Sequence, residues 1–518
     1  MKMTGNLRKL RLFFSLFFCL TLLFSCSNPS SDSPAPQNNA AVEILKKLGD
    51  RVEIESLGQD TDENNVVYFY FTQPIDHNDE SKGYFKQYCV LHYKGRDNLT
   101  VLMTNGYSIE EKNDYAFEDI AYMLSTNYIE VEHRYCKNSD IGLAGPYKGQ
   151  YWAYNTAEQA TADLHEIVTA LKATSDFGGK WISTGLSKNG ILTSMYAYKY
   201  PNEVDVYVAF GAPFIKGLEE EAIGTYLADN CGNQVADVNT GERVKDLVWN
   251  ALSDYLTTET ARASVEIYAK SVNKEYETQN SDTIKKLITY EYVNSLFSKY
   301  AYYKWNLWAK YIPLLSKFEN ESELYAKCFY IFATTNEKNF KKNIEEIKKI
   351  FPMDESSTQS RLQSNLENEA IQYHQSPEKV VEDAYFVQAA MELGYYLLDW
   401  TPVKNSLSQS DIDQFDSWGT ITNYSEKYGV SYDNGALMQS FLDFLENNSS
   451  NSQCKMVFIY GENDPWTGAA IPGESVDNIY IKKILIPEGT HNSYLDNRSY
   501  YSKEDSKKIM SVIKAFLN

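Results

Sequence analysis

The sequence predicts an α/β protein: a mostly parallel sheet flanked by helices, with a large helical lid inserted into it. Within an expected core segment of 46–214, from about residue 64 on, short apolar runs alternate with stretches of helical periodicity, an order typical of a parallel sheet with helices on both faces. From 215 to 440 long amphipathic helical stretches dominate, and from 441 to 518 the strand pattern returns. A sheet that is interrupted and then resumed indicates a core domain with an inserted lid.

The expected core elements follow one another along the chain. Runs rich in tyrosine and valine at 65–75 and 84–95 suit an antiparallel strand pair. Apolar periodicity then predicts strands within 99–107, 127–135, 180–185, 204–213, 454–466 and 478–491, and core helices at 155–175, 186–201 and 506–518. Helices associated with the insertion are expected at 243–256, 283–312, 340–351 and 436–448.

Residues 1–25 have the composition of an export signal. Basic residues precede an apolar run of about fourteen residues, which is too short to span a bilayer. The run ends in Leu-Phe-Ser-Cys, which resembles a bacterial lipoprotein signal with Cys26 as the lipidated residue; simple secretion is the alternative. Residues 26–45 are rich in Ser, Pro and Asn and are expected to form a flexible tether. We therefore expect an exported lipoprotein anchored to a bacterial membrane and facing the periplasm or the cell surface.

Charge and composition exclude several classes of function. The formal net charge of the 518 residues is −21, so nucleic acid is not expected as a partner. The sequence has no HExxH, phosphate-binding glycine loop or EF-hand pattern, so neither a metal nor another cofactor is expected. Five cysteines beyond Cys26 lack CxxC spacing, and both disulfides and buried free thiols remain open for them: Cys89, Cys136, Cys231, Cys328 and Cys454.

A serine between glycines is the first candidate for chemistry. Ser187 lies in the stretch GLSKNG (185–190), which partly fits G-x-S-x-G, the sharp strand-to-helix turn that exposes a nucleophile. The alternative is an ordinary turn residue. Asn189 stands where the pattern has glycine, so we expect it to crowd the turn and expect Asn189→Gly to relieve the crowding.

Two further residues complete a catalytic triad in the expected order. A serine nucleophile needs a histidine base and an acid that orients the histidine. Asp464 follows the strand within 454–466, and His491 follows the next strand near the C-terminus. Alone, each would be an ordinary loop residue; together with Ser187 they predict a serine hydrolase. An oxyanion hole is expected from the backbone N–H of Lys188 and that of Gly106 or Tyr107, whereas the Lys188 side chain could be solvated.

At this point the chain resembles a family of exported serine peptidases, the prolyl tri/tetrapeptidyl aminopeptidases. This is serine-peptidase family 37 of clan SC (the PS-10 type), related to prolyl carboxypeptidase. The resemblance runs from about Tyr68 to His491 and rests on blocks that occur in the family's order: FTQPIDHN, YFKQYCVLHYKG, NGY, EVEHRY, EQATADLHEIVTALK, KWISTGLSKNG, AYFVQAAMELGYY and YGENDPWT. It implies an α/β-hydrolase core with a helical lid, and release of short peptides from free N-termini, often after proline. The family's elbow usually reads GGSKGG, so Leu186 and Asn189 are departures.

The resemblance also points to a carboxylate in an apolar stretch. Glu392 lies in AYFVQAAMELGYYLLDW, where few neighbouring groups in the sequence could solvate it. Its partner is either an internal Arg or Lys or the ammonium of a substrate, and the family's use of this block favours substrate binding. Gln388, one helical turn earlier, would face the same cavity. An esterase on the same fold and a non-catalytic peptide-binding lipoprotein remain alternative functions.

Overall fold

The structure is a computed structural model in which residues 39–58, 66–109, 119–141, 149–233, 243–272, 274–297, 384–451, 454–473, 479–491 and 503–518 are described. The chain divides into two units, Met1–Asn39 and Ala40–Asn518, and the description below concerns the second. The expected signal peptide, Cys26 and most of the tether lie outside the described residues.

Nine strands form one sheet in the order β1-β2-β3-β5-β4-β6-β7-β10-β11. The contacts β1–β2, β2–β3 and β3–β5 are antiparallel, and every other contact in this sheet is parallel. The sheet therefore confirms the predicted α/β-hydrolase fold class. The strands are β1 (Val52–Gly58), β2 (Val66–Pro74), β3 (Tyr84–His92), β4 (Thr100–Thr104), β5 (Asn127–Val131), β6 (Trp181–Leu186), β7 (Val206–Phe210), β10 (Met456–Gly461) and β11 (Ile481–Ile486).

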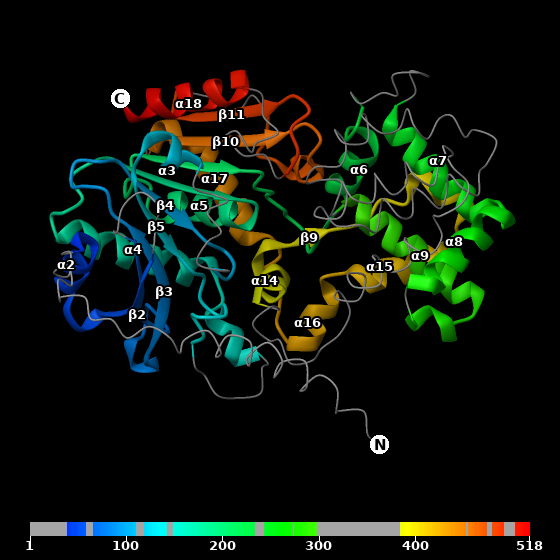
Figure 1. The fold of residues 1–518 in the computed structure, drawn as a ribbon, viewed down its shortest axis with the longest axis horizontal. Helices are drawn as coiled ribbons and strands as arrows, with labels where there is room; N and C mark the ends of the chain where they lie inside the picture. The colour runs from blue at the N-terminus through cyan, green and yellow to red at the C-terminus, as the bar shows by residue number, and fades with distance from the viewer. Residues whose placement is uncertain are drawn as a thin grey trace, which may run out of the picture. The chain divides into compact units, whose positions relative to one another are not determined.

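Both faces of the sheet are buried because successive side chains of a strand point to opposite sides. On β4, Leu102 belongs to one apolar cluster, whereas Val101 and Met103 belong to another. The first cluster includes residues of α2 (Ala40–Lys46), α4 (Ala157–Ala173), α5 (Lys188–Lys199) and α17 (Ala436–Asn451). The second includes residues of α3 (Asp119–Leu124) and α18 (Lys503–Leu517), and Figure 1 shows α18 in red beside β11.

Three boundaries differ from those expected. Helix α2 begins at Ala40, inside the expected tether 26–45, because Ala41, Ile44 and Leu45 are buried in the core. Helix α17, placed across the lid boundary at 440, belongs to the core cluster through Met438 and Phe441. The π-helix η7 (Ala389–Leu393) also contributes to this core cluster rather than to the lid cluster, and α14 (Ala384–Gln388) before it contributes to a smaller cluster with Tyr135 and Trp152.

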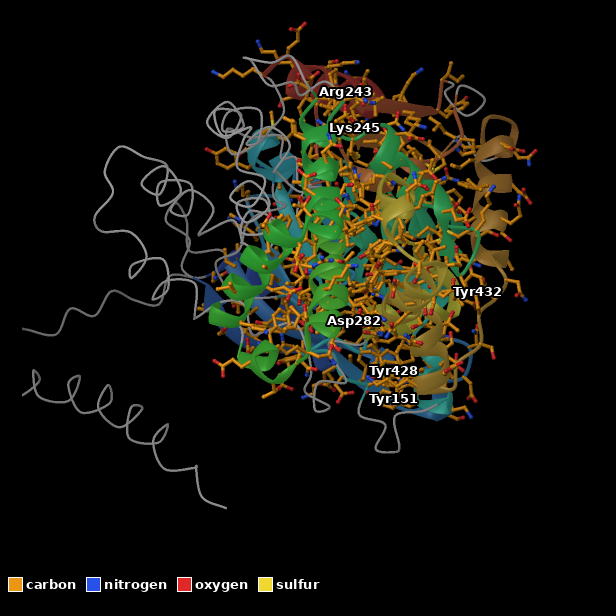
Figure 2. All side chains as sticks on the ribbon, turned by 90° about the vertical axis from the view of Figure 1, so that its right-hand side faces the viewer. Tyr151, Arg243, Lys245, Asp282, Tyr428 and Tyr432 are labelled. Atoms are coloured by element: carbon orange, nitrogen blue, oxygen red, sulfur yellow. The ribbon has the colours of Figure 1, made fainter. Side chains whose placement is uncertain are left out.

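The lid helices have an apolar cluster of their own. It joins α6 (Glu221–Asp229), α7 (Val244–Thr257), α8 (Glu259–Val272), α9 (Ser281–Ser295) and α15 (Gln409–Gly419). Figure 1 shows α7, α8 and α9 together in green. Lys245, labelled with Arg243 at the start of α7 in Figure 2, donates from Nζ to the carbonyls of Ala228 and Asp229 at the end of α6. A side chain thus satisfies carbonyls that a helix end leaves open.

Smaller elements connect the lid to the core. Strands β8 (Glu219–Glu220) and β9 (Tyr395–Tyr396) form a parallel pair, and α16 (Thr422–Tyr428) precedes α17. The helix expected at 340–351, the second half of the one expected at 283–312, and Cys328 lie outside the described residues. Four described cysteines are buried free thiols: Cys89, Cys136, Cys231 and Cys454. Within the described ranges, no helix is long and apolar enough to cross a membrane.

Candidate active site

Ser187 lies at the turn between β6 and α5, with a strained backbone. Its φ of 60° and ψ of −124° form a conformation that side-chain-bearing residues rarely adopt. Glycines permit the turn: a Cβ at Gly185 would lie 2.4 Å from the backbone of Asn189, and one at Gly190 would lie 2.9 Å from the Phe210 carbonyl oxygen. The Ser187 N–H donates to that same oxygen at 2.8 Å, which fixes the turn beside the end of β7.

Asn189 does not crowd the turn, which corrects the expectation from the sequence. The absent side chain of Gly185 leaves room for the Asn189 backbone and Cβ. The Asn189 side chain instead accepts a hydrogen bond from the Gly106 N–H, with an N···Oδ1 distance of 2.6 Å. Its role is to hold the loop after β4. Leu186, the other departure, is paired with Phe210 in the sheet register.

Asp464 and His491 form a buried hydrogen-bonded pair in the loops after β10 and β11. The distance between Asp464 Oδ2 and His491 Nδ1 is 2.8 Å, and the second oxygen of Asp464 accepts the Trp466 N–H at 3.0 Å. Gly211 connects this pair to Ser187. It directly follows Phe210, and a Cβ on it would lie 3.1 Å from His491 and 3.3 Å from Asp464 Oδ2. Ser187, Asp464 and His491 therefore each follow the carboxyl end of a parallel strand of the same sheet, β6, β10 and β11 respectively.

The expected second donor of the oxyanion hole is not available as a backbone N–H. The Gly106 N–H is bonded to Asn189, and the Tyr107 N–H donates to Asn105 Oδ1 at 2.8 Å. The second bond is local, whereas the first ties the loop after β4 to the first turn of α5. In this conformation both N–H groups carry a hydrogen bond, and so does the N–H of Lys188, which is bonded to the Tyr107 phenol; the oxyanion hole therefore stays a prediction.

The phenol of Tyr107 lies close to Ser187 and the Lys188 N–H. Burial raises the pKa of its phenol above the ordinary range and the phenol of Tyr385 raises it further, whereas hydrogen bonding with the Ser187 side chain and the Lys188 N–H opposes the rise. The residue as a whole is 39% exposed. The hydroxyl thus lies beside the candidate nucleophile and the backbone donor that follows it.

The side chain of Lys188 is buried rather than solvated, which corrects the earlier expectation. Only 3% of the residue is exposed, and its Nζ has no hydrogen-bond partner in the described part of the chain. The Nζ lies 5.6 Å from the ring centroid of Tyr107 and 5.2 Å from that of Tyr385. Burial lowers the Lys188 pKa to about 8, while electrostatic interaction with Cys136 and with Glu392 opposes the fall.

Glu392 and Gln388 are adjacent, as their spacing predicts. Glu392 Oε1 accepts the Ala157 N–H at the start of α4 at 2.5 Å and the Gln388 amide at 2.9 Å. No ion pair involves Glu392 within the described ranges, so the internal partner is a set of neutral donors. Burial raises the Glu392 pKa to about 7, and the charge of Lys188 is among the weaker influences that lower it.

Aromatic rings that the sequence analysis did not assign to the site border the candidate triad. The Trp466 ring centroid lies 4.5 Å from that of His491 and 5.9 Å from that of Tyr396. Tyr385 and Tyr395 continue the series, with centroids 6.3 Å apart. All four rings are partly exposed. The position of Trp466 two residues after Asp464 was a usable signal. The tyrosines belong to the same apolar and aromatic stretch as Glu392, which the sequence analysis assigned to the substrate cavity without singling out these rings.

The sheet order and the strand–helix elbow define an α/β-hydrolase, a fold with many serine hydrolases. Comparison with known sequences makes the assignment narrower. Residues 45–298 match the family described as PS-10 peptidase S37. The chain is also 23% identical over 492 residues to a prolyl tri/tetrapeptidyl aminopeptidase from Streptomyces mobaraensis, covering 95% of this chain and 87% of the relative. Over residues 45–298 the chain is thus similar to the PS-10 peptidase S37 family, and it is a serine hydrolase of the peptidase type.

Solved structures give more distant similarities. The crystal structure of VinJ covers 86% of this chain and 98% of its own, with a TM-score of 0.36 and 10% identity. A proline iminopeptidase from Mycobacterium smegmatis has the same coverage, with a TM-score of 0.35 and 10% identity.

Proposed function

We propose that this protein is a lipid-anchored, exported serine exopeptidase that releases short peptides, of three or four residues, from free N-termini. The observation that carries the proposal is the buried 2.8 Å hydrogen bond between Asp464 and His491. This pair packs against Gly211, which follows Phe210 at the end of β7, and the Ser187 N–H is hydrogen-bonded to the Phe210 carbonyl. The relative from Streptomyces mobaraensis is a prolyl tri/tetrapeptidyl aminopeptidase by name, which supports the peptide length and a preference for proline.

In the proposed mechanism His491 is the general base. Nδ1 donates to Asp464, which leaves Nε2 as the basic nitrogen that takes the Ser187 Oγ proton while Oγ attacks the substrate carbonyl carbon. The N–H of Lys188 stabilises the oxyanion. His491 then gives the proton to the leaving amine, which departs, and the N-terminal peptide remains attached to Ser187 as an ester. Water, deprotonated by His491, hydrolyses this ester and frees Ser187.

Glu392 is proposed as the group that binds the substrate ammonium, with Gln388 orienting it. Oε1 is occupied by the Ala157 N–H and the Gln388 amide, and within the described residues no donor meets Oε2. An ammonium at Oε2 would give the carboxylate the charged partner that its burial calls for. A carboxylate at a fixed distance from Ser187 also fixes the length of the released peptide.

The aromatic rings beside His491 support a preference for proline at the cleaved bond. Trp466, Tyr395 and Tyr396 have partly exposed rings, and a pyrrolidine ring packs well on flat apolar surfaces. The same surface would also accept other compact apolar residues, so proline is expected to be preferred over larger polar residues at this position.

The first test is labelling with a fluorophosphonate. The wild type should form one covalent adduct, which peptide mapping should locate at Ser187, and Ser187→Ala should lose the adduct and about 10⁶-fold in turnover while remaining folded. Asp464→Asn and His491→Ala should be severely impaired, but not additively with Ser187→Ala. A folded wild type that takes no label would instead support the non-catalytic peptide-binding lipoprotein.

The second test separates a peptidase from an esterase. A library of peptides with free N-termini should be cleaved with a higher kcat/KM than a panel of p-nitrophenyl esters. Glu392→Gln should raise KM for peptides with free N-termini and leave N-acetylated peptides and esters unchanged. Glu219→Gln is the matched control, because burial also raises the Glu219 pKa to about 7 but its carboxylate accepts the Ile421 N–H instead. Equal losses on all substrates would assign Glu392 to folding alone.

The lipid anchor has its own test. Full-length protein should partition with the membrane fraction and carry acyl groups on Cys26 by mass spectrometry, and Cys26→Ser should release it with unchanged specific activity. Wild-type protein that is secreted without acylation would contradict this part of the proposal and leave the peptidase assignment intact.

A further inference from the structure

Trp466 contacts both members of the Asp464–His491 pair. It lies in the 3-10 helix η9 (Pro465–Ala469), which follows Asp464 directly. Its backbone N–H donates to Asp464 Oδ1 at 3.0 Å, and its ring centroid lies 4.5 Å from that of His491, with an angle of 36° between the two planes. The same residue therefore touches the acid through its backbone and the base through its ring.

The contact between the two rings depends on the charge of the imidazole. The face of an indole ring attracts a cation that lies within about 6 Å of the ring centroid. In the proposed mechanism His491 is neutral before the attack and becomes an imidazolium as it takes the Ser187 proton. The indole at 4.5 Å therefore attracts His491 more strongly once the proton has been transferred. An interaction that strengthens as charge develops lowers the barrier of the step.

We propose that Trp466 is a positioning residue of the base: it holds the His491 ring and stabilises the imidazolium form through the face of the indole. The inference rests on the proposed function, since it assigns a role in the same proton transfer. The indole exchanges no atom or electron in the step. The serine proton goes to His491 Nε2 and leaves with the amine, and the ring contributes only its electrostatic potential.

Aromatic rings on the lid side hold the indole in place. Tyr396 of β9 and Phe297, which follows α9, have ring centroids 5.9 Å and 6.4 Å from that of Trp466. Both rings meet the indole nearly at right angles, at 86° and 82°, and Trp466 packs against the apolar cluster of the lid helices. A ring that is already fixed beside His491 needs no reordering when the charge develops, so its full interaction is available in the transition state.

Other ionisable groups from the lid and from the loop after β10 lie around Asp464: Tyr226, Cys231, Lys245 and Glu462. Burial raises the pKa of the Tyr226 phenol and of the Cys231 thiol, and electrostatic interaction with Asp464 raises both further. Neither group therefore loses its proton near neutral pH. A change of activity with pH in that range, on a substrate that does not use Glu392, is then assigned to the Asp464–His491 pair as a unit.

Trp466→Leu and Trp466→Phe test the inference on p-nitrophenyl acetate. This ester carries no ammonium for Glu392 and no proline ring for the aromatic surface. Trp466→Leu should lower the plateau of kcat/KM by about 3-fold to 30-fold and move its acid limb to lower pH by about 0.5–1.5, because the imidazolium loses its stabilising ring. Trp466→Phe keeps a weaker aromatic face, so both of its effects should lie between those of Trp466→Leu and the wild type. The rate of fluorophosphonate labelling at Ser187 should show the same displacement with pH.

Trp418→Leu is the matched control. Trp418 in α15 is also a partly exposed indole, and its ring packs on Tyr290 and Phe415 of the lid cluster. The same loss of an aromatic ring from the lid side should therefore leave both the plateau and the acid limb as in the wild type.

Two results would overturn the inference. A lower plateau with an acid limb that stays in place would show that the indole only packs on His491. A raised KM for proline-containing peptides, with unchanged hydrolysis of the ester, would confine Trp466 to substrate binding.

Fluorinated tryptophans at position 466 replace the leucine variant should it not fold. They keep the shape of the indole and weaken its aromatic face with each fluorine, so the acid limb should move stepwise to lower pH. A limb that stays in place along this series would also overturn the inference. Failure of the wild type to label at Ser187 would end the proposed function itself, whereas normal labelling with an unmoved limb ends only the role of Trp466.

Discussion

Asn189→Gly should destabilise the protein, the reverse of what the elbow pattern alone predicts. The substitution removes the Oδ1 that accepts the Gly106 N–H at 2.6 Å, and Gly106 is buried. A buried donor left without its acceptor costs about 1–3 kcal/mol. Glycine in the first turn of α5 adds about 0.5 kcal/mol relative to asparagine. The expected total is therefore about 1.5–3.5 kcal/mol.

The size of Ala40–Asn518 determines how large the thermal shift will be. At roughly 2 cal/mol/K per residue, the unfolding entropy of this unit is about 1 kcal/mol/K, so the melting temperature should fall by about 1–4 °C. Differential scanning calorimetry at neutral pH measures this shift. Asn447→Gly, at an exposed position of α17, is the control for the intrinsic effect of glycine in a helix.

A conservative variant isolates the hydrogen bond. Asn189→Asp keeps an oxygen acceptor for the Gly106 N–H and should recover most of the lost stability. The reasoning is refuted when Asn189→Gly melts at or above the wild-type temperature, because the turn would then be crowded after all. Loosening of the Gly106–Tyr107 loop should also slow fluorophosphonate labelling of Ser187.

Three further predictions concern the site. Gly211→Ala should lower kcat by at least about tenfold, since the added Cβ would lie 3.1 Å from His491. Gly429→Ala is the control: Gly429 also has a positive φ but lies in open space, so this variant should lose only about 1–2 kcal/mol of stability and no activity. The pKa of Glu392 in the folded protein, about 7, exceeds its ordinary value of 4.5, so the contribution of Glu392 to stability is present below pH 4.5 and is lost as pH rises through 7. Glu392→Gln should therefore raise the melting temperature more at pH 8 than at pH 5. An equal effect at both pH values would contradict the burial of the carboxyl group. Lys188→Met removes a charge that lowers the Glu392 pKa, so the acid limb of kcat/KM for peptides with free N-termini should move to higher pH, and a limb that stays in place would show that the two groups do not interact.

Local patterns predicted much of the core. The apolar runs that became β4, β6, β7 and β10 are buried on both faces, so they were recognisable as continuous stretches. Strand β1 was not predicted, because its residues alternate between half-buried and exposed and its sequence, VEIESLG, is half polar. The order Ser187, Asp464, His491 was also readable, since each follows a strand and the fold fixes their sequence.

The surroundings of the triad could not be predicted in the same way. The position of the Lys188 side chain depends on Gly106 and Tyr385, which are distant in the sequence and adjacent only in the folded chain. Likewise, the acceptor for the Gly106 N–H comes from a residue 83 positions later. Such contacts are set by how the loop after β4 meets the start of α5, and no periodicity within either segment reports them.

The strained backbone conformation of Ser187 makes serine a costly residue at this position. At φ of 60° and ψ of −124° any side chain is disfavoured, and glycine alone could adopt this conformation without strain. A descendant that had ceased to carry out chemistry would gain about 1–2 kcal/mol by exchanging this serine for glycine, with no loss of packing. Mutational drift without selection for a hydroxyl would favour that exchange. A serine held in a conformation that glycine would adopt with less strain is what the proposed role of its hydroxyl as nucleophile requires.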